Sequence, residues 1–75
     1  MEIIFLNEKT NEVLGKSDDA NILSAIFTPH AQIQIAGNCE TFHCKFLYNV
    51  VKTFEKEIEI YLEVEEVTKK NNQGD

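Results

Sequence analysis

The side chains with the widest range of chemistry are Cys39, Cys44, His43 and His30. A structural zinc site needs four such ligands, typically as two short pairs, and the four residues between Cys39 and Cys44 are the outer limit of that spacing. If residues 40–55 are helical, Cys39 and His43 lie on the apolar half, and Cys44 lies about 140° away from Cys39. We therefore predict core cysteines, a partly buried His43, no metal site and no cofactor.

Nucleophilic catalysis needs a Ser or Cys held by a base and an orienting acid. Cys44 follows His43 directly, but adjacent residues of a helix point about 100° apart, so the two side chains do not form such a pair. The glycines at positions 15, 37 and 74 are isolated, so no glycine-rich loop is present to cradle a phosphate. These patterns predict that the protein is not an enzyme.

The strongest pattern is the stretch Glu55–Glu66 (EKEIEIYLEVEE), in which apolar and charged residues alternate. Such alternation is typical of a β-strand with one face on a core and the other in water. The apolar face consists of Ile58, Ile60, Leu62 and Val64. Six Glu and one Lys give the stretch −5 of the net charge of −6, so the acidity of the chain is local.

Two hypotheses account for this row of glutamates. In the first, the row imitates the phosphates of DNA and binds a basic protein. Successive carboxylates on one face of a strand are about 6.6–6.8 Å apart. This is roughly twice the ~3.4 Å between phosphates along one DNA strand. In the second, the charges serve only solubility, and the chain is a structural or adaptor module that dimerises through an apolar or β-edge surface. Lys56 is the one lysine within the row, and Tyr61 is either a cross-strand contact or an interface anchor. The candidate partner-binding residues are Glu55, Glu57, Glu59, Tyr61, Glu63, Glu65 and Glu66.

The composition narrows the classes of partner. The sequence has no arginine and its seven lysines are scattered, which disfavours direct binding of nucleic acid or of an anionic membrane. No apolar run approaches the roughly 20 residues that span a membrane. The start, MEIIFLNEK, lacks a basic region and a cleavage site, so we expect no signal peptide, a cytoplasmic protein and reduced thiols.

The remaining elements follow from periodicity and turn residues. Glu2–Leu6 and Val13–Lys16 are predicted to form a β-hairpin, and Ala31–Ala36 a further strand. Asn21–Thr28 fits a helix and a strand equally well, and we favour a strand or an irregular extended segment. Glu40–Glu55 is expected to be an amphipathic helix, because its apolar residues cover one half of a helical projection. That half contains Phe42, Phe46, Leu47, Val50, Val51 and Phe54.

The expected fold is α+β, with a small antiparallel or mixed sheet of about four strands and one amphipathic helix packed on one face, in the order β-β-(β)-β-α-β. Residues 1–67 form this single domain, and residues 68–75 are a frayed polar tail. A domain of 75 residues buries only a small core and usually needs additional stabilisation from a disulfide, a metal or a partner subunit. We expect a two-fold homodimer, which would also double the acidic row.

In size, in the local acidity of Glu55–Glu66 and in its arginine-free composition rich in Lys, Asn, Ile and Glu, the chain resembles a family of small proteins. These are the acidic host-takeover proteins of lytic phages that infect Gram-positive bacteria. The resemblance implies a DNA mimic that inhibits a basic DNA-binding protein of the bacterial host. The histone-like nucleoid protein HU and the DNA polymerase sliding clamp are two such targets.

Overall fold

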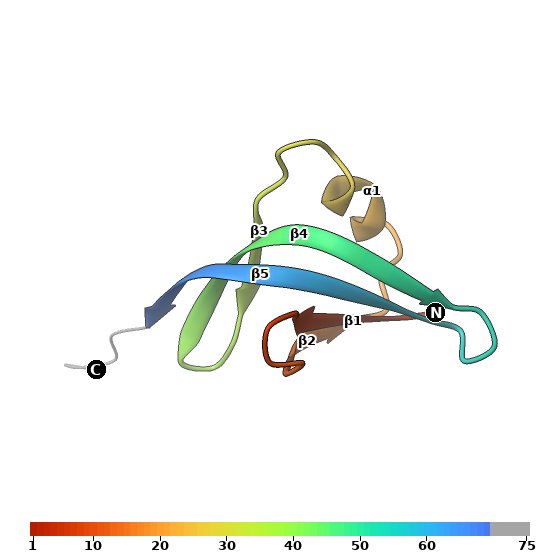
Figure 1. Ribbon diagram of the computed structural model, residues 1–75, viewed down its shortest axis with the longest axis horizontal. Helices are drawn as coiled ribbons and strands as arrows, with labels where there is room; N and C mark the ends of the chain where they lie inside the picture. The colour runs from red at the N-terminus through yellow and green to blue at the C-terminus, as the bar shows by residue number, and fades with distance from the viewer. Residues whose placement is uncertain (70–75) are drawn as a thin grey trace.

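The computed structural model describes residues 1–69 and consists, within that range, of five β-strands and one short helix (Figure 1). The strands form one sheet in the order β2-β1-β5-β4-β3, in which β1 and β5 are parallel and the other neighbours are antiparallel. The elements are β1 (Glu2–Asn7), β2 (Val13–Ser17), α1 (Ile22–Ile26), β3 (Ile33–Ala36), β4 (Glu40–Lys52) and β5 (Glu57–Lys69). The fold is therefore a curled mixed sheet rather than a sheet with a packed amphipathic helix.

The predicted helix over Glu40–Glu55 is wrong, because this segment is the long strand β4 and the turn that follows it. A β-bulge near Leu47 explains the error: Phe46 pairs with Leu62, and Tyr48 pairs with the preceding residue of β5. The extra residue shifts the alternation, so the inward positions are even before the bulge and odd after it. An interrupted period of two resembles a helical period, and the β-branched and aromatic residues of the segment favour the strand.

The prediction for Asn21–Thr28 is also wrong in its preferred form, since Ile22–Ile26 is a single helical turn. No side chain in the described part of the protein caps this helix with a hydrogen bond, although the Asp19 carboxylate accepts the Asn21 N–H at 3.0 Å just before it. The hairpin β1–β2 and the strand β3 are confirmed. Strand β5 runs on through Thr68 and Lys69, and the rest of the expected tail, residues 70–75, lies outside the described residues.

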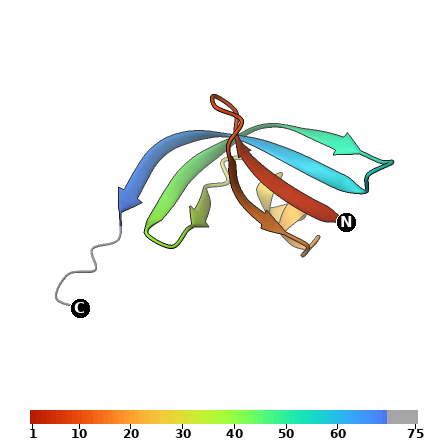
Figure 2. The same cartoon turned by 90° about the horizontal axis from the view of Figure 1, so that it is seen from below.

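The core fills the concave side of the curled sheet, where α1 lies under the arch formed by the strands (Figure 2). Its buried members come from three strands and from α1, namely Ile3, Phe5, Ile26, Cys44, Ile58, Ile60 and Leu62. The curl brings the edge strands β2 and β3 close together. A Cβ added to Gly15 of β2 would lie only 3.1 Å from Cγ2 of Ile35 on β3. No other part of residues 1–69 forms a layer on the opposite, convex side of β1, β4 and β5, which is called the outer face below.

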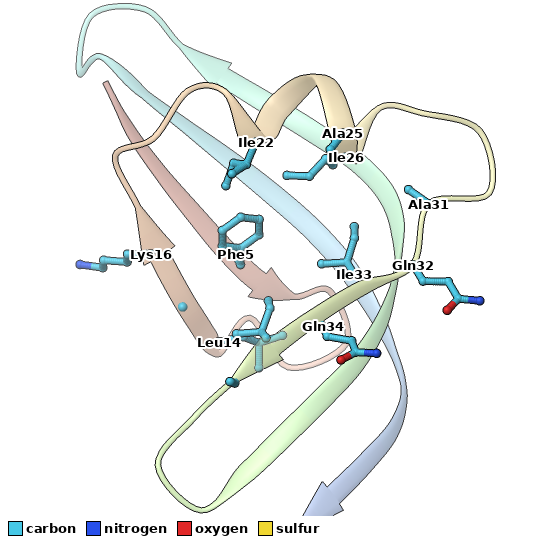
Figure 3. Close-up of a pocket in the computed structure, with 13 residues that line it drawn as sticks. Phe5, Leu14, Lys16, Ile22, Ala25, Ile26, Ala31, Gln32, Ile33 and Gln34 are labelled. Carbon is cyan, nitrogen blue, oxygen red and sulfur yellow. The ribbon is translucent and has the colours of Figure 1, made fainter.

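A cavity of about 440 Å³ lies between β2, β3 and α1. Phe5, Leu14 and Ile33 surround it, whereas Lys16 and Gln32 point away from it (Figure 3). Its described lining contains no acid, histidine or cysteine. Among residues 1–69, no helix is long and apolar enough to cross a membrane.

Candidate protein-binding face

The outer face is set by the register of β4 and β5. Because Ile58, Ile60 and Leu62 point into the core, the odd-numbered residues between them point outward. Their partners on β4 lie on the same face, since directly opposed residues of an antiparallel pair share a side. The opposed pairs of the outer face are Glu57 with Lys52, Glu59 with Val50, Tyr61 with Tyr48, and Glu63 with Lys45.

Two stacked tyrosines occupy the middle of this face. The rings of Tyr48 and Tyr61 lie 4.8 Å apart with an interplanar angle of 17°. Leu6 pairs with Tyr61 and is only 7% exposed, yet it is not a member of the inner core. Leu6 therefore lies beside Tyr61 on the outer side of the sheet. Tyr48 remains 47% exposed and presents an aromatic surface to solvent.

The expectation that the glutamate row lacks interleaved cations, apart from Lys56, is wrong. Lys52 Nζ lies 2.9 Å from a carboxylate oxygen of Glu59 and 3.9 Å from one of Glu57. Lys45 Nζ lies 4.0 Å from Glu65. Both lysines belong to β4. Because this segment was expected to be a helix, its lysines were not expected to lie beside the glutamates in the sheet. The outer face is acidic, but its carboxylates do not form an unbroken track.

The carboxylate of Glu59 has the most partners on the outer face. It binds Lys52, and the Tyr61 hydroxyl donates a hydrogen bond to its Oε1 at 3.0 Å. These two hydrogen bonds, that from Lys52 first, lower the pKa of Glu59 below its ordinary value. The same contacts raise the pKa of Lys52 and that of Tyr61. Glu59 is therefore held ionised beside the tyrosine stack.

The Lys52→Met variant is expected to raise the pKa of Glu59 towards its ordinary value. Because this pKa is lower in the folded protein than in the unfolded chain, the ionised carboxylate stabilises the fold at neutral pH. That contribution is lost as the pH falls through the folded-state pKa. An NMR titration of the Glu59 carboxyl carbon measures the change. Lys45→Met is the control, and an equal rise in both variants would contradict the assigned contact.

The structure brings only part of the predicted set of partner-binding residues together. Glu57, Glu59, Tyr61 and Glu63 share the outer face. The other three lie outside this cluster. Glu55 is in the turn between β4 and β5, Glu65 is the extra residue at a bulge, and Glu66 lies opposite His43 beyond that bulge. Sequence reasoning missed Tyr48, Val50 and Lys52 as members of the face, although the β-branched pair Val50-Val51 was a signal for a strand.

The predicted core position is confirmed for Cys44 and wrong for Cys39. Cys44 is buried in the inner core, and Cys39 is exposed in the turn before β4. His43 donates or accepts a 2.9 Å hydrogen bond between its Nε2 and the Thr68 hydroxyl. Within the described part of the chain, no three His, Cys, Asp or Glu side chains are grouped so that they could hold a metal ion.

Alkylation is expected to distinguish the two thiols. Burial, and secondarily the charge of Glu65, raise the pKa of the Cys44 thiol, and the thiolate is the reactive form. In the folded protein iodoacetamide should therefore modify Cys39 first, and modify Cys44 only after denaturant is added. Tandem mass spectrometry, which locates the label within the tryptic peptide 17–45 that contains both cysteines, measures the order. Modification of Cys44 as fast as that of Cys39 without denaturant would contradict its place in the core.

Comparison of the chain with protein-family models, with curated proteins and with solved structures finds no match. The protein is therefore classified only by its fold and by the arrangement of side chains on its outer face. It is a small curled β-sheet protein whose convex face carries an aromatic pair flanked by carboxylates.

Proposed function

We propose that this protein acts by binding a basic protein through its outer face. The observation that carries the proposal is the Tyr48–Tyr61 stack, which lies half-exposed at the centre of that face. Carboxylates flank it along β5, with Glu59 on one side and Glu63 on the other. Protein interfaces commonly have this anatomy, with an aromatic centre and a polar rim.

The charge of the chain supports a cationic protein as the partner. The net charge is −6, and the sequence contains no arginine. Such a chain attracts a basic surface over a distance and repels nucleic acid and anionic lipid. The outer face contributes to this field, because more carboxylates than ammonium groups lie along β5 and β4.

A narrower form of the proposal identifies the partner as a DNA-binding protein of a bacterial host, from which the outer face displaces DNA. The resemblance to phage host-takeover proteins supports it, with HU and the sliding clamp as the targets to test. Lys52, which lies between Glu57 and Glu59, breaks the regular carboxylate spacing. The narrower form therefore rests on an acidic face with an aromatic anchor and not on imitation of phosphate spacing.

The test compares two variants with the same change in net charge. Glu57, Glu59, Glu63 and Glu65 are changed to Gln in the first, which removes charge along β5. Glu12, Asp18, Asp19 and Glu40 are changed to the matching amides in the second, which removes the same charge away from the outer face. Each immobilised protein is exposed to a bacterial lysate at low and at high salt, and purified HU bound to fluorescent DNA provides the competition assay.

The proposal predicts that the wild-type protein and the second variant retain the same basic proteins at low salt and release them at high salt. The first variant should retain none of them. Equal loss by both variants would mean that only total charge matters and would contradict the outer face as the site. Displacement of DNA from HU by the wild-type protein, but not by the first variant, supports the narrower form. Its absence with retained basic binding would reject the narrower form alone.

A further inference from the structure

Strand β4 is much longer than the strand beside it. The pairing of β3 with β4 covers only Thr41–Cys44 of β4, and β4 continues to Lys52. Residues 45–52 therefore have β5 on one side and no strand on the other within the described chain. The β4–β5 hairpin projects beyond the rest of the sheet at this end (Figure 1). An open edge of this kind can pair with another strand.

The hydrogen-bonding pattern identifies which groups of β4 face the open edge. The N–H of Glu2 binds the carbonyl of Lys56, and the N–H of Glu8 binds the carbonyl of Leu62, so the even-numbered residues of β5 face β1. The odd-numbered residues of β5 then bond to their partners at positions 48, 50 and 52 of β4. It follows that the N–H and C=O groups of Asn49 and Val51 point outward from the edge.

Over its last five residues the edge has little of the usual protection against strand pairing. It contains no proline, and its bulge lies before Tyr48. Val50 is 38% exposed and Val51 is 53% exposed, so the described residues do not cover them. Lys52 is the one charged residue here, and its ammonium group is directed to Glu59 and Glu57 on its own chain.

The distribution of charge shows what can approach this edge. The segment Thr41–Phe54 contains no Asp or Glu, although the chain carries 13 acidic residues. A basic partner would gain little attraction here, whereas a second copy, itself at −6, meets no carboxylate on the strand with which it pairs. This open edge of an acidic protein is thus suited to contact with itself.

We propose that two copies of this chain associate by antiparallel pairing of their β4 edges about a two-fold axis at Val50. This register keeps the bulged Leu47 outside the paired segment. It places Val50 opposite its own copy, Asn49 opposite Val51, and the ring of Tyr48 opposite Lys52 of the second copy. The two sheets become continuous, and both outer faces lie on the same side, with the acidic β5 strands flanking an acid-free centre.

The test measures self-association and its register. Wild-type protein should sediment at twice the mass of one chain and dissociate on dilution. Asn49→Pro removes an N–H that points to the open edge and leaves the β5 ladder intact; this variant should remain monomeric with an unchanged far-UV circular dichroism spectrum. A wild-type protein that stays monomeric at millimolar concentration would overturn the proposal.

Cross-linking tests the register. In the Cys39→Ser background, Val50→Cys should form an intermolecular disulfide on mild oxidation, because directly opposed residues at a non-hydrogen-bonded position lie about 4.5 Å apart. Val13→Cys, exposed on β2, is the matched control and should not cross-link. Equal cross-linking of both variants would overturn the β4 edge as the interface. Self-pairing through β4 and binding of a basic protein through the outer face are independent proposals. Asn49→Pro should abolish self-pairing and leave the outer-face carboxylates in place, so each proposal can fail without the other.

Discussion

Replacing Leu62 with alanine is expected to lower the free energy of unfolding by about 2–5 kcal/mol. Leu62 lies on β5, between β1 and β4, and is 0% exposed. Its removal leaves a cavity in the middle of a core that contains few other fully buried side chains. For 75 residues the total stability is of the order of 4–11 kcal/mol, so the variant should be close to unfolding at room temperature.

Urea unfolding followed by circular dichroism measures this loss. Val13→Ala is the control, because Val13 is exposed on the edge strand β2. It should change the free energy of unfolding by about 0.5 kcal/mol or less. If Leu62→Ala were no more destabilising than Val13→Ala, the inner side of β5 would not be the core of the protein.

Replacing Tyr48 with alanine is expected to weaken binding of the basic partner by about 30-fold, which corresponds to about 2 kcal/mol. The variant removes one ring of the stack, uncovers the ring of Tyr61, and leaves every carboxylate of the outer face in place. Calorimetry with purified HU-type protein measures the change.

Tyr48→Phe is the matched control and should bind within about 2–3-fold of the wild-type protein, because the stack depends on the ring rather than on the hydroxyl. Measuring both variants in the Asn49→Pro background separates loss of the partner from loss of self-pairing. If Tyr48→Ala bound the basic partner with unchanged affinity, the aromatic pair would not contribute to binding, and only the charge of the outer face would remain as its basis.

Much of the sheet could be predicted because its strands have regular signals. Strand β5 alternates strictly up to its bulge, and β3 alternates over its four residues. The hairpin β1–β2 has two short apolar strands separated by polar residues. In these segments the local pattern and the buried face agree, so local reasoning is sufficient.

Strand β4 could not be predicted from periodicity, because its bulge changes which residues face inward. Phe46 points to the core opposite Leu62, whereas Tyr48, only two positions later, pairs with Tyr61 on the outer face. The position of a bulge depends on pairing with β5, which is a tertiary contact. The β-branched and aromatic residues of the segment were the local signal that favoured a strand over a helix.

The candidate site was predicted as one strand, but the structure makes it a property of two. Glu57, Glu59 and Glu63 lie where the alternation of the sequence put them, whereas Glu65 is the extra residue at a bulge. The tyrosine stack and the contact between Lys52 and Glu59 needed the register of β4 against β5. That register changes the interpretation, from a bare acidic row to an aromatic pair with partly neutralised carboxylates beside it.

The most direct measurement of the central claim is an NMR titration of the isotope-labelled protein with unlabelled HU-type protein. If the outer face binds the partner, amide shifts at low salt should concentrate on four of its residues and vanish at high salt, namely Tyr48, Val50, Glu59 and Tyr61. Shifts confined to α1 and β2, or the absence of shifts at millimolar concentration and low salt, would contradict the outer face as the binding surface.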